Sequence, residues 1–271
     1  MTSRTVILVW KQWYHNKPVL TYGENAWGIG DMLRGACGMF LLSKRMGFRL
    51  ILDFSLHPIS DFLQVAEHEY SALVHDKKDA VPFVDDAAQF MEHDDSDVLL
   101  LFSTFGPYIY DNHDAHPELQ DFIRNALTPT KEFQEYIDSN REKMPSGPYS
   151  VLHYRLGDNE LVHNTEQKHI SMYASHVITN KLDTDLLFSD SHSLKSAVRQ
   201  VCNVFMFNEP ICHVGFSTDK SAVRQTLFEL FVLMEATSVR SYSVYGWTSG
   251  FVKAICTVYK IPLQSFCDFR V

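Results

Sequence analysis

The chain has 271 residues, which is enough for one large domain or for two smaller domains that each have a core. Hydrophobic residues make up 45% of the sequence and aromatic residues 13%, a composition typical of globular rather than disordered proteins. The formal net charge of -9 argues against nucleic acid as the main partner, because duplex binding relies on clustered Lys and Arg. A small phosphorylated ligand remains compatible with this charge, since it needs only one or two local cations.

The apolar segments are short. The N-terminal run at Val6–Trp10 is too short for a signal sequence, and no window approaches the roughly 18 apolar residues of a membrane span. The five cysteines are scattered and lack Cys-x-x-Cys spacing, which is typical of reduced thiols and not of a zinc site. We therefore expect a soluble, cytoplasmic protein with no membrane insertion and no bound metal.

The first elements form a strand, loop, helix and strand in succession. Val6–Trp10 reads as a short buried strand. The loop Gly28-Ile29-Gly30-Asp31 then precedes apolar residues at helical spacing, and Gly47 is well placed to end that helix. A second strand is expected at Arg49–Phe54.

The segment that follows is acidic and less periodic. Short helices are expected near Asp61–Glu67 and Asp85–Met91, then a strand at Val98–Phe102 and a helix at Lys131–Lys143. The Pro- and Gly-containing stretch Met144–Pro148 is the best linker candidate in the chain.

Beyond this linker, strands alternate regularly with helices. This alternation predicts a parallel sheet covered by helices on both faces. We therefore expect two α/β domains, residues 1–148 and 149–271, with a central cleft between them. The expected strands are Ser150–Tyr154, Asp185–Ser189, Val204–Phe207 and Val239–Ser243, and the expected helices lie near Lys168–Asn180, Leu194–Cys202, Ser221–Ala236 and Trp247–Tyr259.

The most informative segment is the first of these strands, which runs directly into His153-Tyr154-Arg155-Leu156-Gly157-Asp158. Open α/β sheets bind ligands at the carboxyl ends of their strands. The planar guanidinium of Arg155 suits a phosphate, and strand alternation puts His153, Arg155 and Gly157 on one side. The plainer interpretation is an Arg–Asp surface pair at a strand end.

Two other strand-to-helix turns could also bind a phosphate-containing ligand. Glycines at Gly28 and Gly30 would let a ligand approach a helix N-terminus, and Arg34 lies one turn further on. The alternative is a tight strand-to-helix turn with Asp31 near the N-cap. The hydroxyl-rich segment Ser241–Phe251 joins the last long strand to the last long helix, and it could hold a diphosphate or simply cap that helix.

Two acidic segments flank the strand expected at Asp185–Ser189. Phe188-Ser189-Asp190-Ser191 ends one strand and begins a helix, so its polar side chains could either cap the helix or contact a nucleoside. Asp183 and Asp185 form an Asp-x-Asp pattern, but they precede their strand and would lie at the opposite end of the sheet. A metal site there is the weaker interpretation.

Taken together, four motifs in this order resemble the fucosyltransferase superfamily that includes α1,2-, α1,6- and protein O-fucosyltransferases. They are Gly-Ile-Gly-Asp-Met-Leu-Arg-Gly, His-x-Arg-x-Gly-Asp, Phe-Ser-Asp-Ser and Ser-Tyr-Ser before the terminal helix. The resemblance spans residues 28 to about 260 and implies a GT-B-like α/β fold of two Rossmann-type domains that face a central cleft. It also implies a glycosyltransferase that moves a sugar from a GDP-linked donor, most plausibly GDP-fucose, to a glycan acceptor by inverting, metal-independent transfer without a further cofactor.

The same resemblance implies roles for individual residues. Arg155 would grip the diphosphate and neutralise the charge on departing GDP. His153 and Asp158 would support the nucleotide or orient Arg155, and Asp190 would contact the base or ribose. The remaining implied contacts are Ser241 and Ser243 to the phosphates, and Gly28, Gly30 and Arg34 from the N-terminal domain, which would be the acceptor side.

Three departures from the family pattern bear on the function. Leu156 stands where many relatives have a second basic residue, Asp31 stands where the glycine pair is usually followed by Asn, and the doubled Ser appears as Ser-Tyr-Ser. A different sugar such as xylose, from a different nucleotide, therefore stays open, as does a non-catalytic nucleotide- or glycan-binding protein. Asp31, Glu160 and His163 are candidates for the general base, and Asp31 is preferred.

Overall fold

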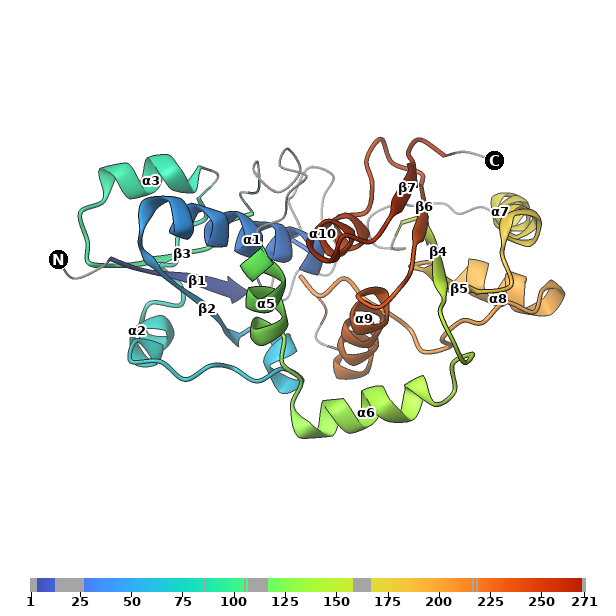
Figure 1. The fold of residues 1–271 in the computed structure, drawn as a ribbon, viewed down its shortest axis with the longest axis horizontal. Coiled ribbons are helices and arrows are strands. Elements are labelled where there is room, and N and C mark those ends of the chain that lie inside the picture. Colours follow the sequence, from blue (N-terminus) through green and yellow to red (C-terminus); the bar gives the residue numbers. More distant parts are fainter. Residues whose placement is uncertain are drawn as a thin grey trace.

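The structure is a computed structural model that describes residues 4–12, 27–84, 86–104, 106, 117–157, 167–215, 217 and 219–269. Within these ranges the chain forms two parallel sheets, one from each half of the sequence (Figure 1). The first sheet has the strand order β2-β1-β3, and the second has the order β5-β4-β6-β7. We call the two halves the N-terminal lobe and the C-terminal lobe.

The predicted first unit is present in the N-terminal lobe. Strand β1 (Thr5–Lys11) lies between β2 (Arg49–Leu56) and β3 (Val98–Leu101), and it is buried on both faces because it is the central strand. Helix α1 (Ile29–Met46) connects β1 to β2. It ends where Gly47 adopts a φ of 76°, a left-handed conformation that glycine reaches without steric cost.

The prediction of a helix at Asp61–Glu67 is wrong. A single 3-10 turn, η1 (Pro58–Asp61), is present instead. Backbone groups of this segment form hydrogen bonds with residues 128–130 instead of with one another. The N–H of Gln64 donates to the carbonyl of Thr128, and the N–H of Thr130 donates to the carbonyl of Phe62. Because these backbone groups are already paired with a distant segment, they cannot form the hydrogen bonds of a helix.

Short helices complete this lobe. The helix expected near Asp85–Met91 is present as α3 (Ala87–His93), which the Asp86 carboxylate caps by accepting two N–H groups. Helix α2 (Ser71–Asp76) and helix α5 (Pro117–Ala126) were not predicted. Helix α6 (Lys131–Arg141) is as expected and leads from one lobe to the other (Figure 1).

The C-terminal lobe follows the predicted alternation closely. Its strands are β4 (Ser150–Arg155), β5 (Asp185–Ser189), β6 (Val239–Ser243) and the unpredicted β7 (Leu263–Phe266). Its helices are α7 (Gln167–Asn180), α8 (His192–Val201), α9 (Lys220–Leu233) and α10 (Gly250–Tyr259).

The prediction of a strand at Val204–Phe207 is wrong, because only one residue of this segment pairs with the sheet. It makes one isolated parallel bridge between Phe205 and Leu186 on β5. Its side chains serve mainly as packing groups, because the Phe207 ring lies 4.8 Å from the ring of Phe228 on α9 and is buried. This segment borders the sheet without extending it.

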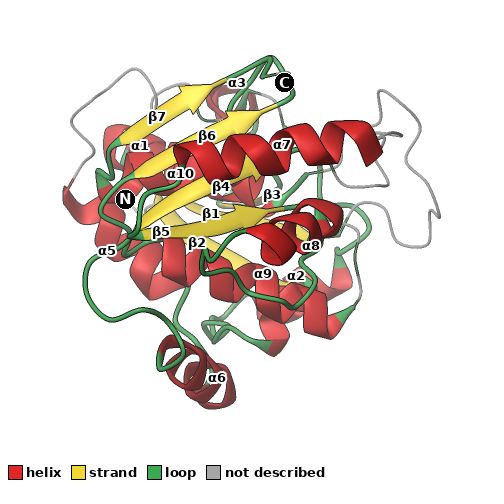
Figure 2. Cartoon of the chain, turned by 90° about the vertical axis from the view of Figure 1, so that its right-hand side faces the viewer, coloured by secondary structure: helices red, strands yellow, loops and turns green. Residues whose placement is uncertain are grey.

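Helices cover both faces of the second sheet, as predicted (Figure 2). One face, with Leu152 and Tyr154 of β4, packs against α7 and α8 in one hydrophobic cluster. The other face, with Val151, belongs to a larger cluster that includes α9 and α10 and continues into the N-terminal lobe. The two sheets therefore share one core, and the proposed boundary between residues 148 and 149 stays a prediction.

Candidate functional site

Arg155 lies at the carboxyl end of β4 and is held there by an acid from the neighbouring strand end. Its Nη1 donates to Oδ2 of Asp190 over 2.7 Å. The Asp190 carboxylate also accepts the N–H groups of Leu156 over 2.9 Å and of Gly157 over 3.2 Å. Gly157 has a φ of 103°, which other residues rarely adopt. One buried carboxylate thus fixes both the guanidinium and the turn that follows it.

The acid paired with Arg155 was not foreseen. Sequence reasoning put Arg155 beside Asp158, which lies outside the described residues together with Glu160 and His163. Asp190 lies 35 positions further along the chain, so only the parallel pairing of β4 with β5 reveals the contact. Its predicted contact to a base or ribose stays a prediction.

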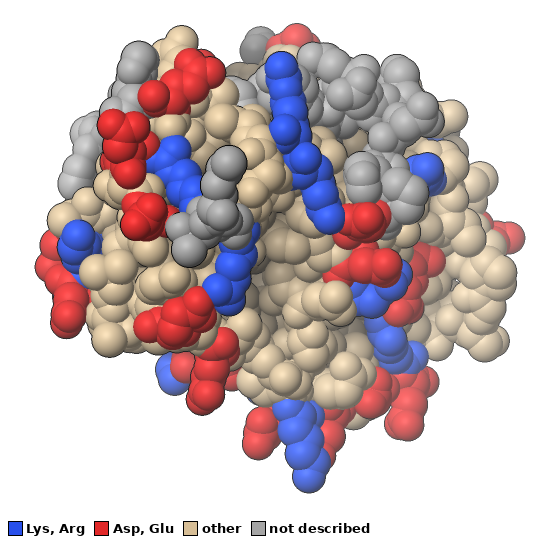
Figure 3. All heavy atoms as spheres, turned by 60° about the vertical axis from the view of Figure 1, so that its left-hand side comes forward, with Lys and Arg blue, Asp and Glu red and all other residues tan. Residues whose placement is uncertain are grey.

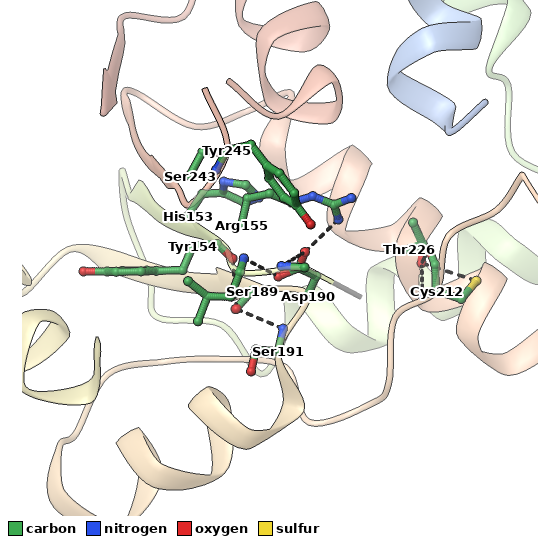
Figure 4. A network of polar contacts seen from close by, with 12 residues as sticks. His153, Tyr154, Arg155, Ser189, Asp190, Ser191, Cys212, Thr226, Ser243 and Tyr245 are labelled. Atoms are coloured by element: carbon green, nitrogen blue, oxygen red, sulfur yellow. Dashed lines mark hydrogen bonds and ion pairs between the residues drawn. The ribbon is translucent and has the colours of Figure 1, made fainter. Parts of the chain in front are cut away.

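An aromatic ring lies on the other flank of Arg155. The guanidinium carbon is 5.9 Å from the ring centroid of Tyr245, within the range of cation–π attraction. Figure 4 shows Arg155 between Tyr245, which follows β6, and Asp190, which follows β5. Tyr245 was part of the hydroxyl-rich turn noted in the sequence, but no role had been predicted for its ring.

His153 is buried and neutral. Its Nδ1 lies 2.9 Å from Oγ of Ser241, its cross-strand neighbour on β6. Burial, reinforced by the positive charges of Arg155 and Lys195, lowers the pKa of His153 to about 3. An uncharged imidazole behind Arg155 therefore supports the strand end without adding positive charge.

The two serines of β6 are engaged within the protein. Ser241 and Ser243 are both fully buried. The hydroxyl of Ser241 bonds His153, while that of Ser243 accepts the N–H of Tyr245 over 3.2 Å. Both serines therefore shape the turn after β6, and their predicted phosphate contacts stay predictions.

A buried ion pair lies behind this strand end. Nζ of Lys195 on α8 is 3.2 Å from Oε1 of Glu229 on α9, and both side chains are at most 5% exposed. Gln225 donates to the same carboxylate oxygen and accepts a hydrogen bond from the hydroxyl of Tyr136 on α6. Sequence reasoning missed this network, because its members come from three helices at unrelated spacing.

The N-terminus of α1 brings a second acid toward Arg155. Asp31 is the third residue of the helix, and its Oδ2 accepts the N–H of Gly28 over 3.2 Å, as the helix-capping interpretation predicted. Its Oδ1 is 3.0 Å from Nη2 of Arg34, whose Nε donates to the carbonyl of Thr104. Arg34 therefore orients Asp31 and ties α1 to the end of β3.

The electrostatics place Asp31 within range of the other lobe. Desolvation raises the pKa of Asp31, while Arg34, the N–H of Gly28 and Arg155 act in the opposite direction. A carboxyl group whose pKa is raised by burial, near a fixed guanidinium, is characteristic of functional sites. Asp31 and Arg155, which were predicted from two distant motifs, therefore interact electrostatically across the two lobes.

Gly30 has a packing role. A Cβ at this position would lie 2.2 Å from the carbonyl carbon of Gly250 and 2.3 Å from the nitrogen of Phe251. The absence of a side chain lets the start of α1 contact the start of α10 directly. The glycine pair predicted to admit a ligand therefore serves at least in part to join the lobes.

Asp185 has a structural position at the opposite end of β5. Its carboxylate accepts hydrogen bonds from the Ser150 hydroxyl over 2.6 Å and the Leu182 N–H over 2.6 Å, and it forms an ion pair with Arg240. Asp183 is exposed. The weaker sequence interpretation, a metal site at these two acids, thus involves a carboxylate that already satisfies three protein groups.

On the face shown in Figure 3, Lys and Arg side chains are interspersed with Asp and Glu. Among the described residues, no helix combines the length and apolar character that crossing a bilayer demands.

Comparison with solved structures identifies the class of fold. The chain has the α/β, GT-B-like architecture of known fucosyltransferases. It superposes on the α-1,6-fucosyltransferase NodZ, co-crystallised with GDP, with a TM-score of 0.55 and 15% identity over 98% of this chain and 96% of that one. NodZ from Bradyrhizobium was also solved after soaking with GDP-fucose.

Two further structures belong to the same group. Arabidopsis thaliana FUT1, in complex with GDP, gives a TM-score of 0.57 at 11% identity over 99% of this chain and 71% of that one. POFUT1 in complex with GDP gives 0.51 at 10% identity over 98% of each chain. No protein-family model matches the sequence, and no curated protein matches it. The similarity therefore establishes the fold.

Proposed function

We propose that the protein is a glycosyltransferase that uses GDP-fucose as its donor and transfers the fucose to a glycan. The observation that carries this proposal is the position of Arg155. It is fixed by Asp190 at the carboxyl end of the central strand β4 and lies within electrostatic range of Asp31 from the other lobe. The similarity to GDP-bound fucosyltransferases supports the same donor.

In the proposed mechanism, Arg155 binds the donor diphosphate. An acceptor hydroxyl attacks the anomeric carbon on the side opposite the diphosphate, and Asp31 takes the hydroxyl proton. The bond between the anomeric carbon and the phosphate oxygen breaks, its electron pair leaves with GDP, and the sugar is transferred with inversion. Arg155 stabilises the negative charge that develops on GDP, so no metal ion is required for this role.

Asp31 suits the role of general base because its carboxylate is partly shielded from water. Burial raises the pKa of its carboxyl group, which makes the carboxylate a stronger base. Arg34 keeps the carboxylate oriented through the 3.0 Å contact with Oδ1. Asp31→Asn should retain the helix cap and lose most turnover, and this separates the catalytic role from the capping role.

The direct test is turnover of GDP-fucose by purified protein, followed as release of GDP with and without glycan acceptors. Arg155→Ala should reduce kcat/KM by about 100-fold or more, because a charge contact made in the transition state is lost. Arg124→Ala is the matched control, since this arginine forms an exposed pair with Asp121 on α5. Equal turnover in Arg155→Ala and the control would refute the proposal.

Donor choice needs a separate measurement, because Leu156 replaces a basic residue of the family pattern. A thermal-shift panel of GDP-, UDP- and TDP-sugars reports the donor, since a ligand that binds only the folded state raises its Tm. A shift with UDP-xylose and none with GDP-fucose would move the proposal to another sugar. Binding of GDP without any turnover would favour the non-catalytic alternative, and full activity in excess chelator would support metal-independent transfer.

A further inference from the structure

The turn after β6 carries an exposed pair of stacked aromatic rings. The centroids of Tyr245 and Trp247 lie 5.0 Å apart, with 21° between the ring planes. Trp247 is 66% exposed, more than any other large hydrophobic residue among those described. A single exposed apolar residue is ordinary, so the position of this pair has to show whether it has a role.

The pair lies beside the candidate functional site. Tyr245 contacts Arg155 through its ring, and Trp247 stacks on Tyr245. Strand β6 is the neighbour of β4 on the side opposite β5. The aromatic pair and Asp190 therefore lie on opposite flanks of Arg155.

A carboxylate completes the group. Asp268 follows β7, the next strand of the sheet, and its N–H donates to the carbonyl of Tyr245 over 2.7 Å. A Cβ placed on Gly246 would lie 3.6 Å from each carboxylate oxygen of Asp268. The exposed carboxylate is thus held next to the segment that connects the two rings.

This combination matches the chemistry of a sugar ring. One face of a pyranose presents C–H bonds that carry partial positive charge, and these are attracted to the electron-rich face of an indole. The hydroxyl groups around the ring donate hydrogen bonds, which a carboxylate accepts. We infer that Tyr245, Trp247 and Asp268 form a binding subsite for a pyranose ring of the acceptor glycan.

The inference rests on the proposed function and adds the location of the acceptor. If the base and ribose of the donor lie toward Asp190 and the diphosphate lies on Arg155, the opposite flank is open to the glycan. A nucleobase is the competing occupant, because bases also stack on exposed aromatic side chains. The experiment must therefore measure glycan and nucleotide binding separately.

The full chain, fluorescently labelled, is applied to an array of defined oligosaccharides, and GDP binding is measured by calorimetry. Trp247→Ala should weaken binding to the recognised glycans by about tenfold, while Trp247→Phe keeps a stacking surface and loses less. Asp268→Asn should weaken it by about threefold, and Asn tolerates the φ of 52° at this position. Leu182→Ala is the control, since this leucine is 54% exposed just before β5, at the opposite edge of the sheet.

Loss of glycan binding in Trp247→Ala, with an unchanged Kd for GDP, supports the subsite. A parallel loss of GDP affinity overturns it in favour of a nucleobase. Wild-type protein that binds no glycan on the array, or Trp247→Ala that binds as well as wild type, also overturns it. A failure of the proposed function would give a different result. The wild type would then neither bind nor turn over GDP-sugars, but it would still bind glycans in a way that depends on Trp247.

Discussion

Replacing Gly30 by Ala tests the contact that joins the two lobes. The new methyl carbon would lie 2.2 Å from the carbonyl carbon of Gly250 and 2.3 Å from the nitrogen of Phe251. Both atoms belong to the backbone, so no side-chain rotation relieves the overlap and α10 must move away from α1. Overpacking of this kind costs about 1–3 kcal/mol, against a gain of up to about 1 kcal/mol from replacing a helical glycine.

Because the overlap is with backbone atoms, the cost should lie at the upper end of this range, about 3 kcal/mol, and the net loss in the free energy of unfolding should be about 2 kcal/mol. This loss lowers the Tm by about 4–8 °C. Urea titration followed by circular dichroism measures the first quantity, and a thermal scan measures the second. Gly250→Ala is the matched control, because the nearest neighbour of its Cβ would be the carbonyl carbon of Gly30 at 3.7 Å, an ordinary van der Waals distance. This substitution should leave stability unchanged or raise it slightly. The reasoning is refuted if Gly30→Ala proves as stable as Gly250→Ala.

Three other predictions concern the residues around Arg155. Buried His153 is neutral in the folded protein, so its contribution to stability is fully present above its unfolded pKa of about 6.5 and is lost as the pH falls toward about 3. In His153→Gln, the free energy of unfolding should therefore decrease less than in the wild type as the pH is lowered through this range. Lys195→Met leaves the charge of Glu229 buried and should cost about 3–5 kcal/mol, whereas Lys195→Met combined with Glu229→Leu should recover much of the loss in urea titrations. Gly157→Ala forces a φ of 103° on a residue with a Cβ, so it should weaken GDP binding in calorimetry; an unchanged Kd would contradict that.

The strand and helix alternation could be predicted because buried parallel strands leave a continuous apolar run between clear turn residues. Helix α1, between Gly28 and Gly47, is the plainest case. Strand β7 could not be predicted in the same way, since it is an edge strand with mostly exposed side chains. Helix α5 was missed although Leu119, Phe122 and Ile123 have helical spacing, so the sequence did contain a signal for it.

The site was predictable only where one strand end supplied the evidence. Arg155 follows an apolar strand directly, so its position at the sheet edge could be inferred from the local sequence. Its contacts with Asp190 and Tyr245 depend on which strands flank β4, and no spacing in the sequence encodes that order. Sequence patterns therefore located Arg155 at the end of its strand, whereas the order of the strands in the sheet determines which side chains lie beside it.

The core that continues from one sheet to the other limits how this protein can be divided. Residues of α9 and α10 such as Val223, Phe228 and Val252 are fully buried, and they belong to the cluster that also contains β1 and α1. A fragment of the C-terminal lobe alone would expose part of this apolar surface to water and lose its stabilisation. The C-terminal lobe is thus not a separable module, and ligand measurements are meaningful only on the intact chain.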